Sequence, residues 1–470
     1  MKHRFKIVAA GLAAVSLFPC LADSAESTAQ KRLERIRHNS PELRAFLAEM
    51  PKGADLHTHL FGAVYAESLI RAAAADHLCI DPFTMSIVRN AGVCGDKLVT
   101  AESAFANQAF YTSLVDAFSM RSFVPSAGHS GHDHFFSTFD RFQTIDPRNH
   151  MGEWLDELAS RAASQNEQYL EIMHTPDFAM AARLGYRIGW NGNLASTRQA
   201  LLAAGLRENV ETDRKEIEDA ETARRQLEHC SGDKQTPGCR VKVRFLFQVL
   251  RGFPPQQVFA QTVLGFELAS VEPLVVGINL VMPEDWNMPM IEYHRQMEML
   301  DYLHSVYPKV HISLHAGELA LGLVPPDGLT FHIREAVELG HAERIGHGVD
   351  VMYEREPHQL LSEMAAKHIL VEINLTSNDL ILGVQGNDHP LPVYRAWQVP
   401  VALSTDDEGV SRIDLTHEYQ RAVEQFGLTY DDLKEIARAS IEHSFLASDE
   451  KARQKSELER RFHAFEANVH

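Results

Sequence analysis

Eight short apolar runs alternate with helical, charged segments along this chain, and no other feature limits its fold as much. Such runs are typical of buried β-strands, and we expect strands near residues 54–60, 169–173, 243–250, 274–280, 310–315, 345–347, 369–373 and 399–404. Amphipathic helices are predicted between the later runs, at 290–307, 330–339 and 357–367. Strands that alternate with helices form parallel sheets, and eight of them predict a closed (β/α)8 TIM-type barrel.

Polar side chains stand at or near the ends of nearly all eight runs. In a (β/α)8 barrel the carboxyl ends of the strands meet at one mouth, where chemistry is carried out. A sandwich would scatter these residues over two ends. The residues are His57, His59, Glu171, Arg251, Asn279, His315, His347, Asn374 and Asp406.

Three further segments lie outside the repeating pattern. Residues 27–50 are predicted to form an amphipathic helix before the first strand, and residues 79–142 and 201–240 are predicted insertions. The second insertion is expected to be a charged helix followed by a loop between two cysteines. Since no Pro/Gly/Ser-rich linker divides the chain, we expect a single domain over residues 23–470.

The first 22 residues are predicted to be a cleaved signal peptide. Lys2, Arg4 and Lys6 precede an apolar stretch at 7–18 that is too short to span a bilayer, and small residues follow it. We therefore expect a periplasmic or secreted protein without membrane attachment after cleavage. The formal net charge of -19, with no Lys/Arg-rich run after residue 45, disfavours nucleic acid as a partner.

Four cysteines remain once the signal is removed, and an exported protein is expected to pair them as two disulfides. The simplest of the three pairings joins Cys79 to Cys94 and Cys230 to Cys239. A structural zinc site made of all four is disfavoured because no C-x-x-C spacing occurs.

The stretch DLHTH, residues 55–59, places two histidines on one face of the first predicted strand. Alone the pair is weak evidence in a chain with 25 histidines. His315, in SLHAGE, and Asp406, in STDDEG, extend it to three imidazoles and one carboxylate at strand ends. His57, His59, His315 and Asp406 are therefore the predicted ligands of a catalytic zinc with an open position.

The chain resembles the adenosine deaminase family through the motifs DLHTHLFGA, YLEIMHTP, SLHAGE, RIGHG, NLTSN and STDDEG, which follow the family's order over about residues 51–410. The resemblance implies a (β/α)8 barrel that holds one Zn²⁺ and a purine nucleoside as the small-molecule substrate. It implies hydrolytic deamination of adenosine, and with it 2'-deoxyadenosine, to inosine and ammonia. The signal and the insertions resemble the secreted, growth-factor-related branch.

The resemblance also implies roles for residues beside the metal. Glu318 matches the residue that protonates purine N1, His347 the residue that orients and deprotonates the attacking water, and Asp407 the residue that hydrogen-bonds N7. Further substrate contacts are expected from His59, Met282, Phe135 and Phe139. The two phenylalanines share a helical face with Phe142, so the same segment is also expected to be a buried amphipathic helix.

Three positions depart from the family's pattern. In NLVMPED, Met282 stands where the family usually has a glycine whose backbone contacts purine N3, and Asn279 replaces an aspartate. Glu408 follows Asp407 where many relatives have proline. The predicted zinc ligands are untouched, whereas the purine side of the site differs.

Several alternatives stay open at this point. The substrate could be adenine or another 6-aminopurine, and the chain could be another mononuclear zinc amidohydrolase or a non-catalytic purine-binding protein. A binuclear site is disfavoured because the fourth strand ends in Gly277-Ile278-Asn279-Leu280, without the lysine that bridges two metals in related hydrolases. The loop motif HSGHDH, residues 129–134, is a weak candidate for a second metal site. The oligomeric state is left open.

Overall fold

The structure is a computed structural model that describes residues 20–89 and 93–469. The predicted signal peptide at 1–22 lies almost entirely outside the described residues. Among the described helices, none combines the length and the apolar character that a membrane span requires.

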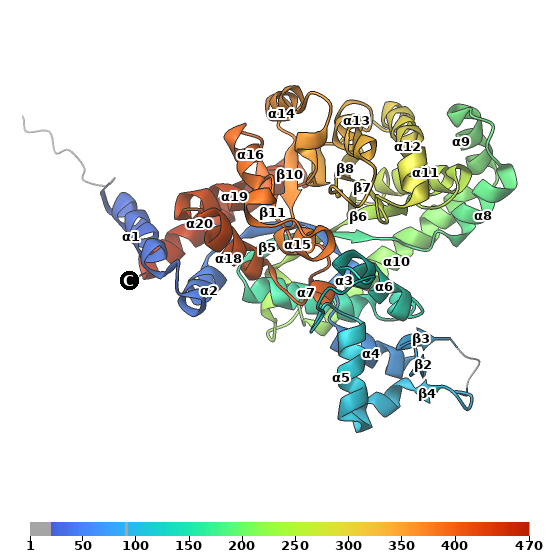
Figure 1. Ribbon diagram of the computed structural model, residues 1–470, viewed down its shortest axis with the longest axis horizontal. Coiled ribbons are helices and arrows are strands. Elements are labelled where there is room, and N and C mark those ends of the chain that lie inside the picture. Colours follow the sequence, from blue (N-terminus) through green and yellow to red (C-terminus); the bar gives the residue numbers. More distant parts are fainter. Residues whose placement is uncertain (1–19, 90–92, 470) are drawn as a thin grey trace, which may run out of the picture.

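Eight parallel strands form a nearly closed barrel at the centre of the molecule (Figure 1), and their neighbours follow chain order from β1 to β11. The strands are β1 (Gly53–His59), β5 (Glu167–His174), β6 (Lys242–Leu250), β7 (Val275–Val281), β8 (His311–Ala316), β9 (Arg344–His347), β10 (Leu370–Ile373) and β11 (Val401–Leu403). Each of the eight predicted runs is confirmed, and so is the (β/α)8 fold class.

The first and last strands meet through a short junction. Asp406 N donates a hydrogen bond to His57 O at 2.8 Å, and His59 N donates one to Asp406 O at 3.2 Å. Since few backbone hydrogen bonds close this seam, side chains near it have a large part in holding the barrel shut. The seam brings the predicted ligands of the first and last strands together.

Helices surround the barrel and bury the outer face of its strands, which accounts for the nearly continuous apolar character of the runs. The three helices predicted between the later strands are confirmed with ends that differ by at most three residues, as α12 (Asn287–Val306), α13 (His332–Glu338) and α14 (Pro357–Ala366). The other helices around the barrel are α3 (Leu60–Ala63), α7 (Met151–Ser164), α8 (Ala179–Ile188), α9 (Leu194–Ala203), α11 (Pro255–Ala269), α15 (Leu375–Leu382), α16 (Leu391–Ala396), α17 (Glu408–Ser411), α18 (Leu415–Phe426) and α19 (Tyr430–Glu442).

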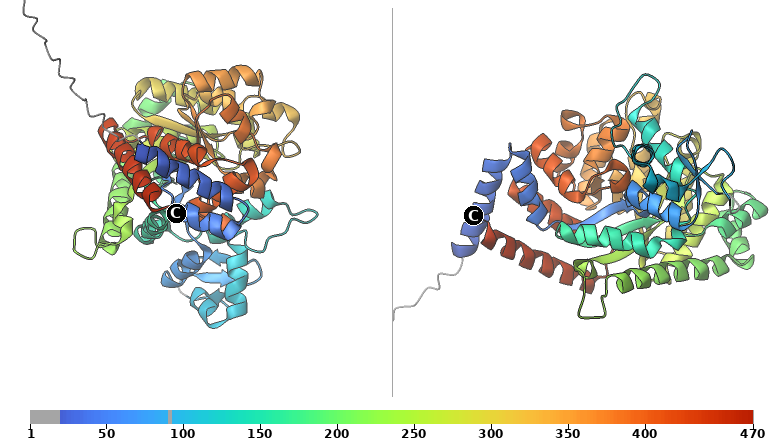
Figure 2. Two further views of the ribbon diagram at one scale, coloured as in Figure 1. Left: turned by 90° about the vertical axis from the view of Figure 1, so that its left-hand side faces the viewer. Right: turned by 90° about the horizontal axis from the view of Figure 1, so that it is seen from below.

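The segment before the first strand is two helices, so the prediction of one helix over 27–50 is wrong. They are α1 (Cys20–Ile36) and α2 (Ser40–Glu49). Asn39 ends the continuity because its side chain accepts a hydrogen bond from Glu42 N, and Pro41 favours a new helix start. In Figure 2, α1 lies against the C-terminal helix α20 (Ser448–Asn468), which it contacts.

The first insertion projects from the barrel as a separate lobe (Figure 1). After α4 (Ala66–Ala75) it forms a small antiparallel sheet of β2 (Cys79–Asp81), β3 (Ser86–Val88) and β4 (Val99–Thr100), then η1 (Ala101–Ala106) and α5 (Gln108–Ala117). The disulfide between Cys79 and Cys94 lies here. The chain then returns to the barrel with α6 (Gly131–Phe142).

The second insertion contains the expected charged helix, α10 (Leu206–Leu227), and the expected loop with a disulfide between Cys230 and Cys239. Both predicted cysteine pairings are therefore confirmed. Buried Arg224 holds the loop to the helix, since its Nη1 donates to Gly238 O in the loop at 3.4 Å and also pairs with Glu228 at the end of α10 at 2.9 Å.

Candidate active site

Three imidazoles and one carboxylate surround a single point at the mouth of the barrel. The Nε2 atoms of His57 and His59 lie 3.5 Å and 3.2 Å from Asp406 Oδ1, and His59 Nε2 lies 3.2 Å from His315 Nε2. Ligand atoms around a tetrahedral zinc with bonds near 2.0–2.1 Å are about 3.3–3.4 Å apart. The structure thus brings together the four predicted ligands at spacings that suit such an ion.

A fifth side chain, His347, lies close to the same point. Its Nε2 is 3.9 Å from Asp406 Oδ2, and it could join His57, His315 and Asp406 around a metal ion. The distances therefore bring together one more candidate than a four-ligand site uses. The assignment of His59 as a ligand and His347 as a base stays a prediction.

The orientation of each imidazole is fixed by an acceptor on another strand of the barrel. His57 Nδ1 lies 2.6 Å from Glu372 Oε2, and His315 Nδ1 lies 2.6 Å from Asn279 Oδ1. His59 Nδ1 lies 2.7 Å from Gln248 Oε1. Because carboxylate and amide oxygens only accept, each ring donates from Nδ1 and turns the lone pair of Nε2 toward the common point.

This donor set fits a divalent cation. His57 Nε2 is fully buried without a hydrogen-bond partner among the described residues, which is costly unless something else binds it. Although burial opposes protonation, the nearby carboxylates of Asp406 and Glu372 raise the pKa of His57 to about 10. The site therefore favours a positive charge at His57. A bound metal ion would supply this charge in place of a proton on the ring.

A buried ion pair with Arg344 fixes the Glu372 carboxylate, and no sequence motif predicted this pair. Arg344 Nε lies 2.7 Å from Glu372 Oε1, and Arg344 Nη2 lies 2.7 Å from Glu171 Oε2. Ser313 Oγ donates to Glu372 Oε1 at 2.8 Å. A charged residue inside an apolar run, such as Glu372 in LVEI, was the available signal, because burial is tolerated only with partners.

Glu318 is fixed beside the cluster by its own backbone. Its N–H donates to Glu284 Oε2 at 2.8 Å, and its side chain is about nine-tenths buried. Burial, with the nearby charges of Asp406 and Glu284, raises the pKa of Glu318 well above its usual value. A raised pKa lets a carboxyl group keep its proton to higher pH, so Glu318 is suited to act as a proton donor.

His347 has the opposite electrostatic character. Burial lowers its pKa to about 3, so the ring is neutral. Its Nδ1 lies 2.9 Å from Asn378 Nδ2 and 3.7 Å from Glu318 Oε1, while its Nε2 has no hydrogen-bond partner among the described residues. A neutral imidazole beside a protonated carboxyl group is an arrangement suited to acid–base chemistry.

Asp407 lies next to the cluster with one oxygen free. Burial and the charge of Asp406 raise its pKa to about 7, although His59 opposes the shift. Its Oδ1 has no hydrogen-bond partner among the described residues. Gly62 makes room for this carboxylate, because a Cβ at Gly62 would come within 1.5 Å of Asp407 Oδ1. The free oxygen could accept a hydrogen bond from a ligand or, when the carboxyl group is protonated, donate one.

Met282 follows β7 directly and has φ +100°, a value that is costly for a side chain other than glycine. Its sulfur lies 3.2 Å from Gly252 N, and a Cβ at Gly252 would come within 2.8 Å of the Met282 methyl group. The side chain thus lies over the end of β6, where a glycine leaves space. Contact between Met282 and a substrate stays a prediction.

The phenylalanines of α6 pack against one another, as the sequence predicted. The rings of Phe135 and Phe139 are 5.9 Å apart, those of Phe139 and Phe142 are 5.3 Å apart, and Phe135 and Phe142 are fully buried. Contact of Phe135 and Phe139 with a substrate stays a prediction. Within the described chain, no metal-binding group forms among the histidines of HSGHDH.

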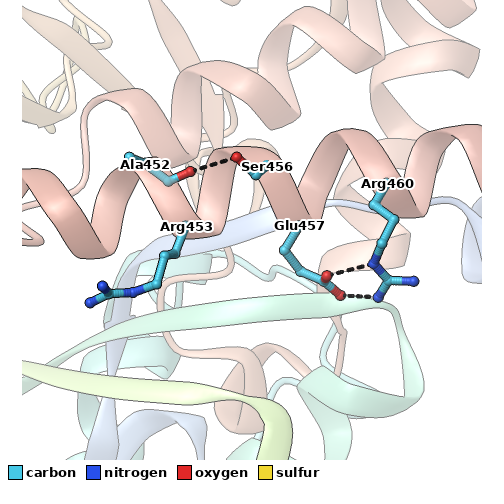
Figure 3. Close-up of a pocket in the computed structure, with 5 residues that line it drawn as sticks. All are labelled: Ala452, Arg453, Ser456, Glu457 and Arg460. Carbon is cyan, nitrogen blue, oxygen red and sulfur yellow. Dashed lines mark hydrogen bonds and ion pairs between the residues drawn. The ribbon is translucent and has the colours of Figure 1, made fainter.

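Two hollows lie away from this site. One, of about 410 Å³, is on α20, where Arg460 pairs with Glu457 on an exposed face (Figure 3). The other, of about 550 Å³, lies at the amino end of the barrel strands beside His311, His443 and Lys451. Neither contains a predicted ligand or a residue that contacts one, so the candidate site is the carboxyl-end cluster.

Comparison with known proteins gives consistent results. The family model described as adenosine deaminase matches residues 127–461, which is more than half of the chain. Two similar curated relatives are the adenosine deaminases of Clostridium perfringens (34% identical over 145 residues, 31% of this chain and 40% of the relative) and Salmonella schwarzengrund (38% over 142 residues, 30% and 39%). The matched part therefore spans about 40% of those relatives' length.

Solved structures share the fold at low identity. Arabidopsis ADAL complexed with GMP has a TM-score of 0.59 at 20% identity, covering 88% of this chain and 98% of that chain. Adenine deaminase from Arthrobacter aurescens has a TM-score of 0.56 at 17% identity, covering 87% and 98%. A cog1816 amidohydrolase from Burkholderia ambifaria, with bound Zn, has a TM-score of 0.59 at 17% identity, covering 91% and 94%.

Proposed function

Because the chain belongs to the adenosine deaminase family, we propose that it is a zinc-dependent aminohydrolase that converts adenosine and 2'-deoxyadenosine to inosine and ammonia. The observation that carries the proposal is the cluster of His57, His59, His315 and Asp406 with Glu318 beside it. Metal ligands and a protonated carboxyl group at one barrel mouth are what hydrolytic attack on a purine ring requires.

Each side chain has a separate task in this proposal. When bound, the metal ion supplies Lewis acidity, which makes water a stronger acid near neutral pH. Glu318, kept protonated by burial, donates its proton to ring nitrogen N1, so that the ring can accept electrons when C6 is attacked. His347, kept neutral by burial, accepts the proton that the attacking water gives up. Asp407, whose raised pKa lets it carry a proton near neutral pH, donates a hydrogen bond to N7 through its free oxygen.

The charges around the site support an uncharged substrate. Glu318, Asp406 and Asp407 are buried together, and two nearby arginines, Arg161 and Arg251, have partners, although Arg251 Nη2 has none among the described residues. Arg161 pairs with Glu408 at 2.6 Å, and Arg251 donates to His315 O at 3.2 Å. A phosphate would bring negative charge close to the Asp406 carboxylate and to two further acidic side chains, so a nucleoside is favoured over a nucleotide.

Adenine or another 6-aminopurine is the second candidate substrate. Met282 favours it, because a thioether stands where the family usually has a glycine beside the purine. The similarity of fold to an adenine deaminase is compatible with this alternative. Side-by-side turnover of adenosine, 2'-deoxyadenosine, adenine and AMP distinguishes the candidates.

Ultraviolet absorbance tests the proposed reaction directly. Purified protein should convert adenosine to inosine, and Glu318→Ala should lower kcat by about 10²–10⁴-fold while retaining zinc, because only the proton donor is lost. Glu338→Ala, which removes an exposed carboxylate of α13, is the matched control and should behave like the wild type. An active wild-type enzyme with far less than one zinc per chain would contradict the ligand assignment.

Export to the periplasm or the medium completes the proposal, with residues 23–470 as one mature domain that needs no membrane. The two disulfides support it, since such bonds persist mainly in oxidising compartments. Amino-terminal sequencing of the mature protein tests the cleavage near residue 22. An intact amino terminus would contradict the proposal.

A further inference from the structure

The first turn of α6 lies against two segments of the barrel mouth, the helix α15 and the loop after β7. On one side, Gly131 packs directly on α15, since a Cβ at Gly131 would come within 1.9 Å of Leu380 O. On the other side, His132 Nε2 lies 3.0 Å from Asp285 Oδ1. Figure 1 shows α6 beside α15 at the barrel mouth. Gly131 and His132, two consecutive residues of the first insertion, thus touch α15 and the loop after β7.

The topology places this turn over the predicted proton-transfer groups. Asp285 follows β7, and Leu380 follows β10. The two strands between them, β8 and β9, lead to Glu318 and His347. Because the carboxyl ends of neighbouring strands meet at one mouth, the turn of α6 crosses the side of the mouth that holds these two residues.

Asp285 is also adjacent to a residue that holds Glu318. Glu284 Oε2 accepts the hydrogen bond of Glu318 N at 2.8 Å, and Asp285 is the next residue in the chain. The pair of His132 with Asp285 therefore connects the insertion to the loop that orients Glu318. The Asp285 side chain has no other hydrogen bond or ion pair among the described residues, so His132 is its one polar partner there.

The site beneath this turn is nearly closed. His59, Glu318 and Asp407 expose 7%, 9% and 6% of their surfaces. These exposures leave little of the three side chains accessible to a purine that touches Glu318, Asp407 and the metal at once. A movement at the mouth would ease substrate entry, and a helix from an inserted lobe, held there by a few contacts, is the element suited to move.

We propose that His132 and Asp285 form a catch that holds the first turn of α6 closed over the bound purine and releases it to admit substrate. Both are positioning residues, since they act through α6 and do not touch the reacting atoms. The proposal rests on the proposed function for the identity of the ligand. It also gives the HSGHDH motif a use other than metal binding.

The electrostatics of the pair support a charged catch. Burial disfavours the protonated ring, but the hydrogen bond and charge of Asp285, together with the charge of Asp133, outweigh burial and raise the pKa of His132. Both partners are largely shielded from water, with side-chain exposures of 14% and 17%. A protonated imidazole bonded to a carboxylate is stronger than a neutral pair.

Steady-state kinetics of three variants test the catch. His132→Ala and Asp285→Ala should each raise KM for adenosine about tenfold while kcat changes less than threefold, because the first turn of α6 is no longer held closed over the bound purine. The double variant should be no worse than either single variant, since both remove the same interaction. A merely destabilised enzyme would lose active molecules, which lowers kcat and leaves KM unchanged.

His129→Ala is the matched control, because His129 belongs to the same motif but contacts His134 within the insertion. Its KM should equal that of the wild type. An unchanged KM in both His132→Ala and Asp285→Ala would overturn the catch. A raised KM in His132→Ala alone would also overturn it, because His132 would then contact the substrate directly.

Amide hydrogen exchange provides a readout that needs no activity. Peptides covering residues 128–139 should exchange about fivefold faster in both single variants and at the wild-type rate in His129→Ala. Unchanged exchange in the catch variants would also overturn the proposal. If the wild type deaminates no purine, the proposed function fails, while the exchange result still decides whether the catch exists.

Discussion

At the candidate zinc site, Asn279 accepts the hydrogen bond of His315 Nδ1 at 2.6 Å and keeps its own Nδ2 buried without a partner. Asn279→Ala should lower zinc affinity about 10–100-fold, because His315 loses the acceptor that fixes its tautomer and orientation. Competition with a chromophoric chelator measures the change.

Asn279→Asp is the matched control. It keeps an acceptor oxygen for His315 and removes the unpaired amide nitrogen, so it should retain wild-type zinc affinity or exceed it. Equal affinities for Asn279→Ala and the wild type would show that this hydrogen bond has no part in holding the metal.

At the scale of elements, α10 is attached to the loop after β5 by Asn209, whose amide group also bonds a buried carboxyl group on the same helix. Asp213 Oδ1 accepts from Asn209 Nδ2 at 3.0 Å, and Asn209 Nδ2 also donates to Asp177 O at 2.6 Å. Burial, with the charges of Glu216 and Asp177, raises the pKa of Asp213 to about 9. The folded protein therefore keeps Asp213 protonated at neutral pH, while the unfolded chain ionises it.

The sign of the pH effect follows from this shift. A raised carboxyl pKa means that the folded state binds a proton that the unfolded state releases, so stability decreases as pH rises from about 4 to about 9. Asp213→Asn should raise Tm by about 2 °C or more at pH 8 and by less at pH 5. Thermal unfolding at both pH values measures this, with Asp219→Asn on the exposed face of α10 as control. A lower Tm at pH 8 would contradict the assignment.

For the whole molecule, the metal site lies at the seam where the barrel closes. Its predicted ligands come from β1, β8 and the residues after β11, and β1 meets β11 through few backbone hydrogen bonds. Removing zinc with a chelator should lower Tm by about 5–10 °C, because binding to the folded state alone stabilises it. Differential scanning calorimetry measures the change. His57→Ala is the control, and its Tm should not respond to the chelator.

Much of the fold was predictable because strand and helix patterns are local. Eight apolar runs gave eight strands, and the polar residues at their ends meet at one mouth because parallel strands share a direction. The two disulfides were predicted because exported proteins usually pair their cysteines and because the partners lie close together in the sequence. The break between α1 and α2 was missed, although Asn39 and Pro41 are local signals for it.

The barrel and the chemical types at its mouth could be predicted from short stretches of sequence, because backbone periodicity and residue type are local properties. Which acceptor orients each imidazole depends on how distant parts of the chain pack together. Glu372, for example, lies 315 residues from His57. The tertiary structure also decided that His132, from an inserted lobe, meets Asp285 beside the Glu318 loop. Such contacts depend on how distant strands and insertions pack around the closed barrel, and no local pattern specifies that packing.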